Sequence, residues 1–178
     1  SWDSMPEAFK PVLRRQMEVY AGFLEFTDHH VGRLFDVINN LGLADDTLIY
    51  YIIGDNGASA EGSFNGCYNE RSDFNGLQAL ETAEYLTERM DKLGGPESYN
   101  HFAVGWAHAM NTPLQWTKQV ASHWGGTRNG TIVHWPKGIK AKGEQRTQFA
   151  HVIDVAPTIL EAAGIPEPLS VDGIQQDP

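Results

Sequence analysis

Cysteine is almost missing from this chain, which has a single thiol, Cys67, in 178 residues. One thiol cannot build an internal disulfide framework or a thiolate cage for structural zinc. Long hydrophobic runs are also missing, since no stretch approaches the roughly 20 apolar residues of a membrane-spanning helix. The opening SWDSMPEAFK lacks the basic-then-apolar pattern of a signal peptide. We therefore expect a soluble protein without a membrane partner, in a cytoplasmic or a periplasmic or secreted setting that the composition leaves open.

Basic residues are scarce: 13 Lys and Arg stand against 23 Asp and Glu, which gives a formal charge of −10. A nucleic-acid-binding protein needs a basic face to neutralise phosphates. The charge balance therefore argues against nucleic acid as a partner.

Acidic residues are unevenly spread, because none occurs between Ser98 and Gly143. A loop-rich region could lack them by compositional accident. Alternatively, the segment faces an anion, which nearby carboxylates would repel. The basic and histidine residues in this window are Lys118, Arg128, Lys137, Lys140, Lys142, His101, His108, His123 and His134.

Hydrophobic periodicity and turn residues predict alternating helices and strands. Apolar residues recur at three- and four-residue steps in the first part of the chain, and β-branched and aromatic residues dominate TLIYYII. The predicted elements are a helix over 7–41, a strand Thr47–Ile53, a surface loop after Gly57, a helix Leu80–Leu93, a third strand around His101–Trp106, a strand Thr131–His134 and a helix from Asp154 through Ala163.

A near-continuous apolar strand after a helix is typical of a mainly parallel sheet flanked by helices, which is an α/β fold. Such a sheet has about five or six strands. The chain offers two clear strands and a weaker third one. We therefore expect residues 1–178 to be a single, incomplete domain.

The tetrapeptide GDNG follows the first predicted strand. In α/β sheets, functional groups gather beyond the carboxyl ends of strands. The oxygens of Asp55 and Asn56 suit a hard cation, Ca²⁺ or Mg²⁺, better than zinc, and the flanking glycines allow a tight approach. A plain turn is the alternative reading, because Asp-Asn-Gly favours turns for conformational reasons alone.

A second group of residues lies in the acid-free window, where TKQVASHWGGTR places Lys118, His123 and Arg128 around a Gly-Gly pair. A lysine supplies a compact positive charge to an anion, and glycines let backbone amides approach it. The alternative is an ordinary solvated loop.

Taken together and in this order, these segments resemble the type I sulfatases, the arylsulfatase group of the alkaline-phosphatase-like superfamily. The resemblance implies that Asp55 and Asn56 are metal ligands, with calcium the usual ion, and that Lys118 is the catalytic lysine that contacts the sulfate. Lys118 stands seven residues before Gly125, where many relatives have six, so this assignment assumes a one-residue insertion. The segments that carry the resemblance are TDHHVGRLF, IYYIIGDNGASAEGS, NTPLQWTKQVASHWGGTRNGTIVHWPKGI and HVIDVAPTILEAAGIPEP.

The same resemblance makes His123 and Arg128 candidates for substrate binding, although a packing role is the alternative for each. It also implies a formylglycine nucleophile, formed from the first residue of a Cys/Ser-x-Pro-x-Arg motif. The stretch from Cys67 to Arg71 has the right spacing, but Asn69 replaces the proline and the stretch follows the metal-binding strand. We interpret this stretch as a coincidence.

The sequence therefore predicts the C-terminal part of a sulfatase catalytic domain, lacking the nucleophile and inactive by itself. Intact, it would be a sulfuric ester hydrolase acting on a small-molecule sulfate ester. The alternatives are a phosphodiesterase or phosphonate monoester hydrolase of the same superfamily, and a non-catalytic anion-binding domain on this fold. Substrate identity and oligomeric state stay open.

Overall fold

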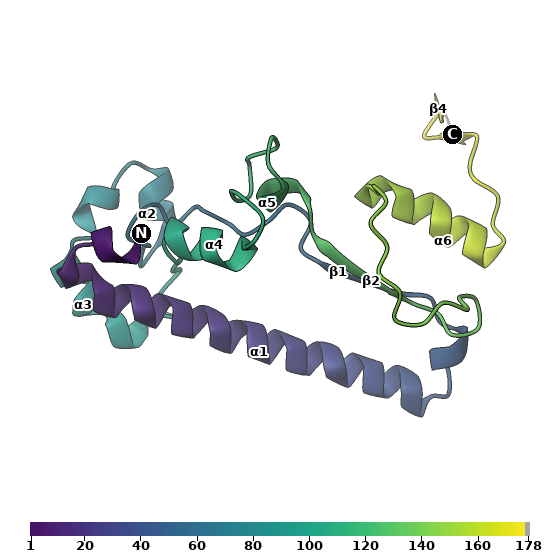
Figure 1. Ribbon diagram of the computed structural model, residues 1–178, viewed down its shortest axis with the longest axis horizontal. Coiled ribbons are helices and arrows are strands. Elements are labelled where there is room, and N and C mark those ends of the chain that lie inside the picture. The colour runs from purple at the N-terminus through teal and green to yellow at the C-terminus, as the bar shows by residue number, and fades with distance from the viewer. Residues whose placement is uncertain (177–178) are drawn as a thin grey trace. The chain divides into compact units, whose positions relative to one another are not determined.

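The longest element is the helix α1, Lys10–Asn40, in a computed structural model that describes residues 1–176 (Figure 1). A short 3₁₀ turn, Glu7–Phe9, leads into it, and Pro11 lies in its first turn, where a missing N–H costs nothing. Gly42 follows with a left-handed backbone, φ +70°, as is usual after a helix end. The helix predicted over 7–41 is confirmed.

Only the first turns of α1 enter a hydrophobic core. Val12 packs with Tyr68, Leu86 and Leu93 in one buried cluster. Toward its end the apolar side chains of α1 are exposed, with Leu34 at 59% and Val37 at 52%.

The strands form two small sheets. β1, Ile49–Ile53, pairs with β2, Gly130–His134, and β3, Ser170–Val171, pairs antiparallel with β4, Ile174–Gln175. Both of the clear strands expected from the sequence are present. The expected mainly parallel sheet is not seen in residues 1–176, which contain only these two two-stranded sheets.

The stretch predicted as one helix from Leu80 to Leu93 is broken into short turns around α3, Ala83–Thr87. Glu81 explains the break, because its carboxylate accepts hydrogen bonds from the backbone N–H groups of Tyr68 (2.5 Å) and Asn69 (3.1 Å). The backbone of Glu81, with φ −86° and ψ 66°, is not helical, so the helix is interrupted at this residue. Thr82 then caps the new helix by accepting from the Tyr85 N–H at 3.2 Å.

The connection after Gly57 is more ordered than a surface loop. It contains α2, Glu70–Phe74, and it buries Cys67 beside His101 in an isolated antiparallel bridge. The strand expected around His101–Trp106 is wrong, because the chain turns at Ala103 into the helix α4, Val104–Asn111.

The remaining helices are α5, Trp124–Thr127, and α6, Val155–Ala163. The predicted helix ending at Ala163 is confirmed, and Gly164 closes it with φ +67°. The chain divides into two compact units, one made of Ser1–Gly42 with Ile52–Thr131 and the other of Leu43–Tyr51 with Ile132–Pro178. The candidate site lies within the first unit.

Candidate functional site

Asp55 and Asn56 directly follow β1, between two glycines in left-handed conformations, Gly54 (φ +73°) and Gly57 (φ +83°). Both side chains are exposed. Within residues 1–176, no hydrogen bond or ion pair engages either side chain. Their oxygens are therefore free to bind a ligand.

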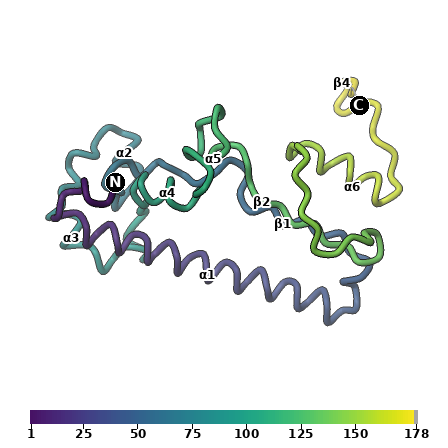
Figure 2. The backbone as a smooth tube through the Cα atoms, viewed as in Figure 1, coloured from purple at the N-terminus to yellow at the C-terminus, as the bar shows by residue number. Residues whose placement is uncertain are grey.

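The backbone of this loop touches the Gly-Gly segment. A Cβ atom added to Gly57 would lie 1.9 Å from the carbonyl oxygen of Gly125, and one added to Gly125 would lie 2.0 Å from the carbonyl oxygen of Trp116. Both positions therefore require glycine for close backbone packing. Figure 2 shows the two segments side by side, at the point where the chain passes from α5 to β2.

Two asparagines join these segments, and sequence reasoning gave neither a role in the site. The Oδ1 atom of Asn129 accepts from the Gly57 N–H (3.1 Å), and that of Asn111 accepts from the Ala58 N–H (3.3 Å). The Asn111 amide also donates to the carbonyl oxygens of Trp116 (2.8 Å) and Gly125 (3.0 Å). Asn129 stands beside Gly130, whereas nothing in the local sequence around Asn111 indicates its role.

Lys118 lies against the loop that begins with Asp55 and Asn56. Its backbone N–H donates to the carbonyl oxygen of Ala58 (3.0 Å), and its Nζ donates to Oε1 of Glu61 (2.7 Å). The side chains of this ion pair are 30% and 22% exposed. The fold thus brings the candidate lysine to the segment that carries the candidate metal ligands.

The backbone around Lys118 is unusual, because Trp116 (φ +65°) and Gln119 (φ +74°) both adopt left-handed conformations. Such a conformation costs roughly 1–2 kcal/mol for a non-glycine residue. The surrounding contacts offset this cost, among them the hydrogen bond from the Gly125 N–H to the carbonyl oxygen of Gln115 (2.8 Å).

Glu61 is the centre of a polar cluster that the sequence did not reveal. Oε1 accepts from Lys118 and from the Gln119 amide (3.3 Å), while Oε2 accepts from the Ser59 hydroxyl. Nε2 of His101 lies 2.8 Å from the Ser59 oxygen and 4.0 Å from Oε2 of Glu61. The Lys118 hydrogen bond, followed by that of Ser59, lowers the pKa of Glu61. The carboxylate is therefore ionised at neutral pH.

His123 and Arg128 make other contacts. Nδ1 of His123 lies 2.9 Å from the Ser122 hydroxyl oxygen, and its ring centroid lies 5.7 Å from that of Trp116. The Arg128 guanidinium stacks over Trp124 at 5.0 Å. Across residues 1–176, no hydrogen bond or ion pair joins either one to Lys118, so their substrate-binding roles stay predictions.

The donors at the end of β1 suit a hard cation in type but not in number. Ca²⁺ takes six to eight oxygen ligands, and Mg²⁺ takes oxygen ligands in octahedral geometry. Asp55 and Asn56 offer a carboxylate and a carboxamide, and residues 1–176 contain no cluster of three or more His, Cys, Asp or Glu that could hold a metal. The described chain thus supplies part of such a site.

Cys67 is not placed to act as a thiolate nucleophile. It is 1% exposed, and burial raises the pKa of its thiol to about 12. The thiol therefore stays protonated and unreactive. This environment agrees with the interpretation of Cys67–Arg71 as a coincidental match.

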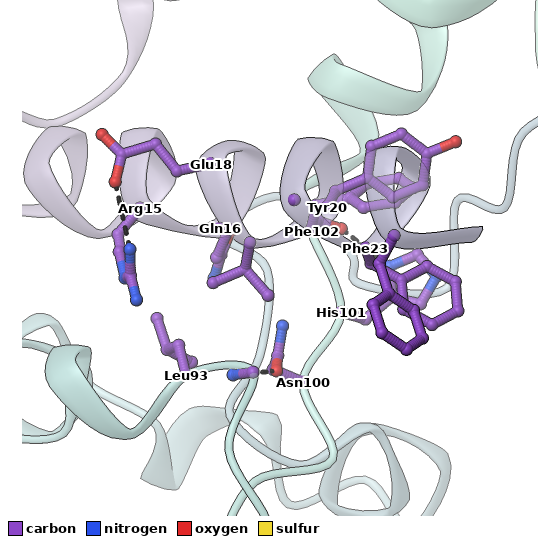
Figure 3. A pocket seen from close by; sticks show the side chains of 13 residues that line it. Arg15, Gln16, Glu18, Tyr20, Phe23, Leu93, Asn100, His101 and Phe102 are labelled. Carbon is purple, nitrogen blue, oxygen red and sulfur yellow. Dashed lines mark hydrogen bonds and ion pairs between the residues drawn. The ribbon is translucent and has the colours of Figure 1, made fainter. Parts of the chain in front are cut away.

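A cavity of about 580 Å³ lies between α1 and residues 93–102 (Figure 3). Tyr20 and Phe102 meet edge to face in its wall, with ring centroids 5.0 Å apart. Oε1 of the buried Gln16 has no hydrogen-bond partner in the described part of the chain. His101 also lines this cavity and so connects it to the Glu61 cluster.

Among the helices of residues 1–176, none has both the length and the apolar character needed to cross a membrane.

Comparison with known proteins agrees with the resemblance. The family model described as Sulfatase matches residues 3–165. An "Uncharacterized sulfatase" of Schizosaccharomyces pombe is 31% identical over 171 residues, which cover 94% of this chain and 28% of that protein. An "Arylsulfatase" of Klebsiella aerogenes is 26% identical over 164 residues, covering 92% of this chain and 33% of that protein.

The chain thus spans about a third or less of the length of these relatives. The family match nevertheless extends over most of its residues and includes the β1 loop, Glu61, Lys118 and the Gly-Gly segment. The chain belongs to the sulfatase family.

Proposed function

We propose that this chain supplies the sulfate-binding lysine and two metal ligands of a sulfuric ester hydrolase of the arylsulfatase type. The observation that carries the proposal is the hydrogen bond from the Lys118 N–H to the carbonyl oxygen of Ala58. It holds the lysine on the loop that starts with Asp55 and Asn56. Membership of the sulfatase family and the similarity to an arylsulfatase support the substrate class.

In this proposal the Lys118 ammonium binds a sulfate oxygen and stabilises the negative charge that grows on the leaving oxygen as the S–O bond breaks. Asp55 and Asn56 would hold Ca²⁺, or Mg²⁺, through their free oxygens. The bound cation would supply Lewis acidity to the sulfate group. A formylglycine, carried by a part of the enzyme other than these 178 residues, is the proposed nucleophile.

The test uses the full-length gene product, because the relatives are about three times longer than this chain. We expect the wild type to hydrolyse 4-nitrophenyl sulfate and to lose this activity with EDTA. Replacing Lys118 by Met should lower kcat by about 10²- to 10³-fold, as loss of an oxyanion-stabilising group does elsewhere. Lys140→Met is the matched control, because Lys140 is exposed and belongs to the same acid-free segment.

Asp55→Ala tests the metal site in the same assay. We expect it to weaken calcium binding, measured by calorimetry, and to raise the calcium concentration needed for activity. Full activity in both Lys118→Met and Asp55→Ala would contradict the proposal.

The two alternatives are outcomes of the same experiment. If the enzyme hydrolyses bis(4-nitrophenyl) phosphate or a phosphonate monoester faster than 4-nitrophenyl sulfate, it is a phosphodiesterase or phosphonate monoester hydrolase and not a sulfatase in activity. Sulfate binding without turnover of any ester would indicate a non-catalytic anion-binding role. The 178-residue chain alone should show no turnover, and an enzyme-like rate from it that survives Asp55→Ala would also contradict the assignment.

A further inference from the structure

Glu61 holds Lys118 from a position five residues beyond Asn56. The carboxylate is mostly covered, with 22% of its side chain exposed, and both of its oxygens accept hydrogen bonds. A carboxylate fixed at both oxygens has little rotational freedom. The ammonium bound to it at 2.7 Å is therefore also fixed in position.

Ser59 and His101 support the opposite side of Glu61. The Ser59 hydroxyl donates to Oε2, and Nε2 of His101 lies 2.8 Å from the Ser59 oxygen. The His101 backbone is held in turn by the bridge to Cys67, through hydrogen bonds of 2.9 and 3.1 Å. A continuous series of contacts therefore links the buried Cys67, through His101, Ser59 and Glu61, to Lys118.

We propose that Glu61 is a positioning residue for Lys118, held in place by Ser59 and His101, and that it aims the lysine ammonium at the sulfate. This inference rests on the proposed function.

The Lys118 ammonium keeps hydrogen-bond donors for a substrate. A lysine ammonium has three N–H donors, and Glu61 accepts one of them. Within the described residues, no other hydrogen bond engages Nζ of Lys118. Two donors are thus available to sulfate oxygens, while the bond to Glu61 sets their direction. Catalysis depends steeply on such orientation.

The first test is kinetic and uses Glu61→Gln in the full-length gene product. Glutamine keeps the size of the side chain and can still accept hydrogen bonds, but it removes the charge that fixes the ammonium. We expect kcat for 4-nitrophenyl sulfate to fall by about 10- to 100-fold, the range typical of supporting residues in active sites, while KM changes by less than about threefold. Glu61→Asp, which retains the charge, should recover part of the loss.

Glu144→Gln is the matched control. Glu144 also forms an ion pair, with Arg146 at 2.6 Å, but both of those side chains are more than half exposed. Its removal should leave kcat unchanged. Ser59→Ala is the second variant, since it leaves the Glu61 charge in place and removes only the supporting hydroxyl. We expect it to lower kcat less than Glu61→Gln does.

The second test does not depend on turnover. Lys118 should react slowly with acetic anhydride in the wild type and several-fold faster in Glu61→Gln, as quantified by peptide mass spectrometry with Lys140 as internal reference. Both changes, lower kcat and faster acetylation, are required. An active wild type in which Glu61→Gln leaves either quantity unchanged overturns the positioning role alone. A wild type that hydrolyses no sulfate ester overturns the proposed function instead.

Discussion

Asn111 shows how the candidate site is held together at the scale of single residues. Its carboxamide accepts from the Ala58 N–H and donates to the carbonyl oxygens of Trp116 and Gly125. One side chain thus satisfies three backbone groups from two segments that are distant in sequence. Buried backbone groups without such partners would destabilise the fold.

The Glu61–Lys118 pair predicts a specific acid sensitivity. The pKa of Glu61 in the folded protein lies below its ordinary value of 4.5, mainly because of the hydrogen bond from Lys118. Above that ordinary value the stabilisation is fully present. As the pH falls from 4.5 through the lower folded-state pKa, it is lost, because the unfolded chain binds the proton more readily.

Urea unfolding between about pH 3 and pH 6 measures this effect. We expect the free energy of unfolding of Glu61→Gln to depend less on pH than that of the wild type, while Glu144→Gln follows the wild type. Identical pH dependence in Glu61→Gln and the wild type would contradict the assigned ion pair.

Cys67 gives a second prediction. Because burial raises the pKa of its thiol to about 12, the native protein should not react with Ellman's reagent at pH 8. The chain in guanidinium chloride should react fully at its single thiol. Rapid reaction of the native protein would show that the bridge between Cys67 and His101 opens readily.

Sequence reasoning at this scale found residues whose chemistry is visible in their type. Asp55 and Asn56 carry ligand oxygens between two glycines, and Lys118 carries a charge in a segment without acidic residues, so local patterns made them candidates whose roles stay predictions. Glu61 and Asn129 were missed because their importance comes from contacts with segments 57 and 72 residues away. Such contacts are not visible in local sequence patterns.

At the scale of elements, the predictions succeeded where local pattern decides the structure. The apolar periodicity that predicts α1 and the β-branched residues that predict β2 both lie within the element that they predict. The single helix predicted over Leu80–Leu93 does not form, because the Glu81 backbone is non-helical where its carboxylate accepts hydrogen bonds from the distant Tyr68 and Asn69 N–H groups. The strand expected at His101–Trp106 does not form, because the chain makes only the isolated bridges Asn69–Tyr99 and Cys67–His101, within the described residues, before α4 begins.

The short helix α5 depends on close backbone packing, which predicts the effect of Gly125→Ala. The new Cβ atom would lie 2.0 Å from the carbonyl oxygen of Trp116 and 2.2 Å from that of Gln115. We expect the free energy of unfolding to fall by about 3 kcal/mol, because the backbone must move to relieve these clashes. Chemical denaturation monitored by circular dichroism measures the change.

Gly32→Ala is the control for this substitution. Gly32 lies within α1, and a Cβ atom there meets nothing within 4 Å. Alanine should therefore raise the stability of the helix by up to about 1 kcal/mol. Equal effects of the two substitutions would contradict the packing described for Gly125.

At the scale of the whole molecule, buried side chains are concentrated in one of the two compact units. Every buried residue within 1–176 belongs to the unit made of Ser1–Gly42 and Ile52–Thr131. In the other unit, large apolar side chains such as Phe149 (90%) and Leu169 (85%) are exposed. The two units therefore differ in the packing that opposes local unfolding.

Amide hydrogen exchange should reveal this difference. We expect slow exchange at residues 12–16 of α1, where Val12, Leu13 and Gln16 are buried. Exchange should be faster in α6, which has no buried residue between Val155 and Ala163. Equal protection of the two helices in the 178-residue chain would show that α6 has stabilising contacts beyond those described.

The hydrogen bond between Gly57 and Asn129 also bears on chemical ageing. Asn56 precedes a glycine, and its deamidation begins when the Gly57 nitrogen attacks the Asn56 carboxamide carbon, closing a cyclic imide and expelling ammonia, after which water opens the ring to aspartate or isoaspartate. Asn129 holds that nitrogen through its N–H at 3.1 Å. During storage in neutral buffer, Asn129→Ala should therefore accumulate acidic isoforms at position 56 faster than the wild type, as isoelectric focusing and peptide mapping would show.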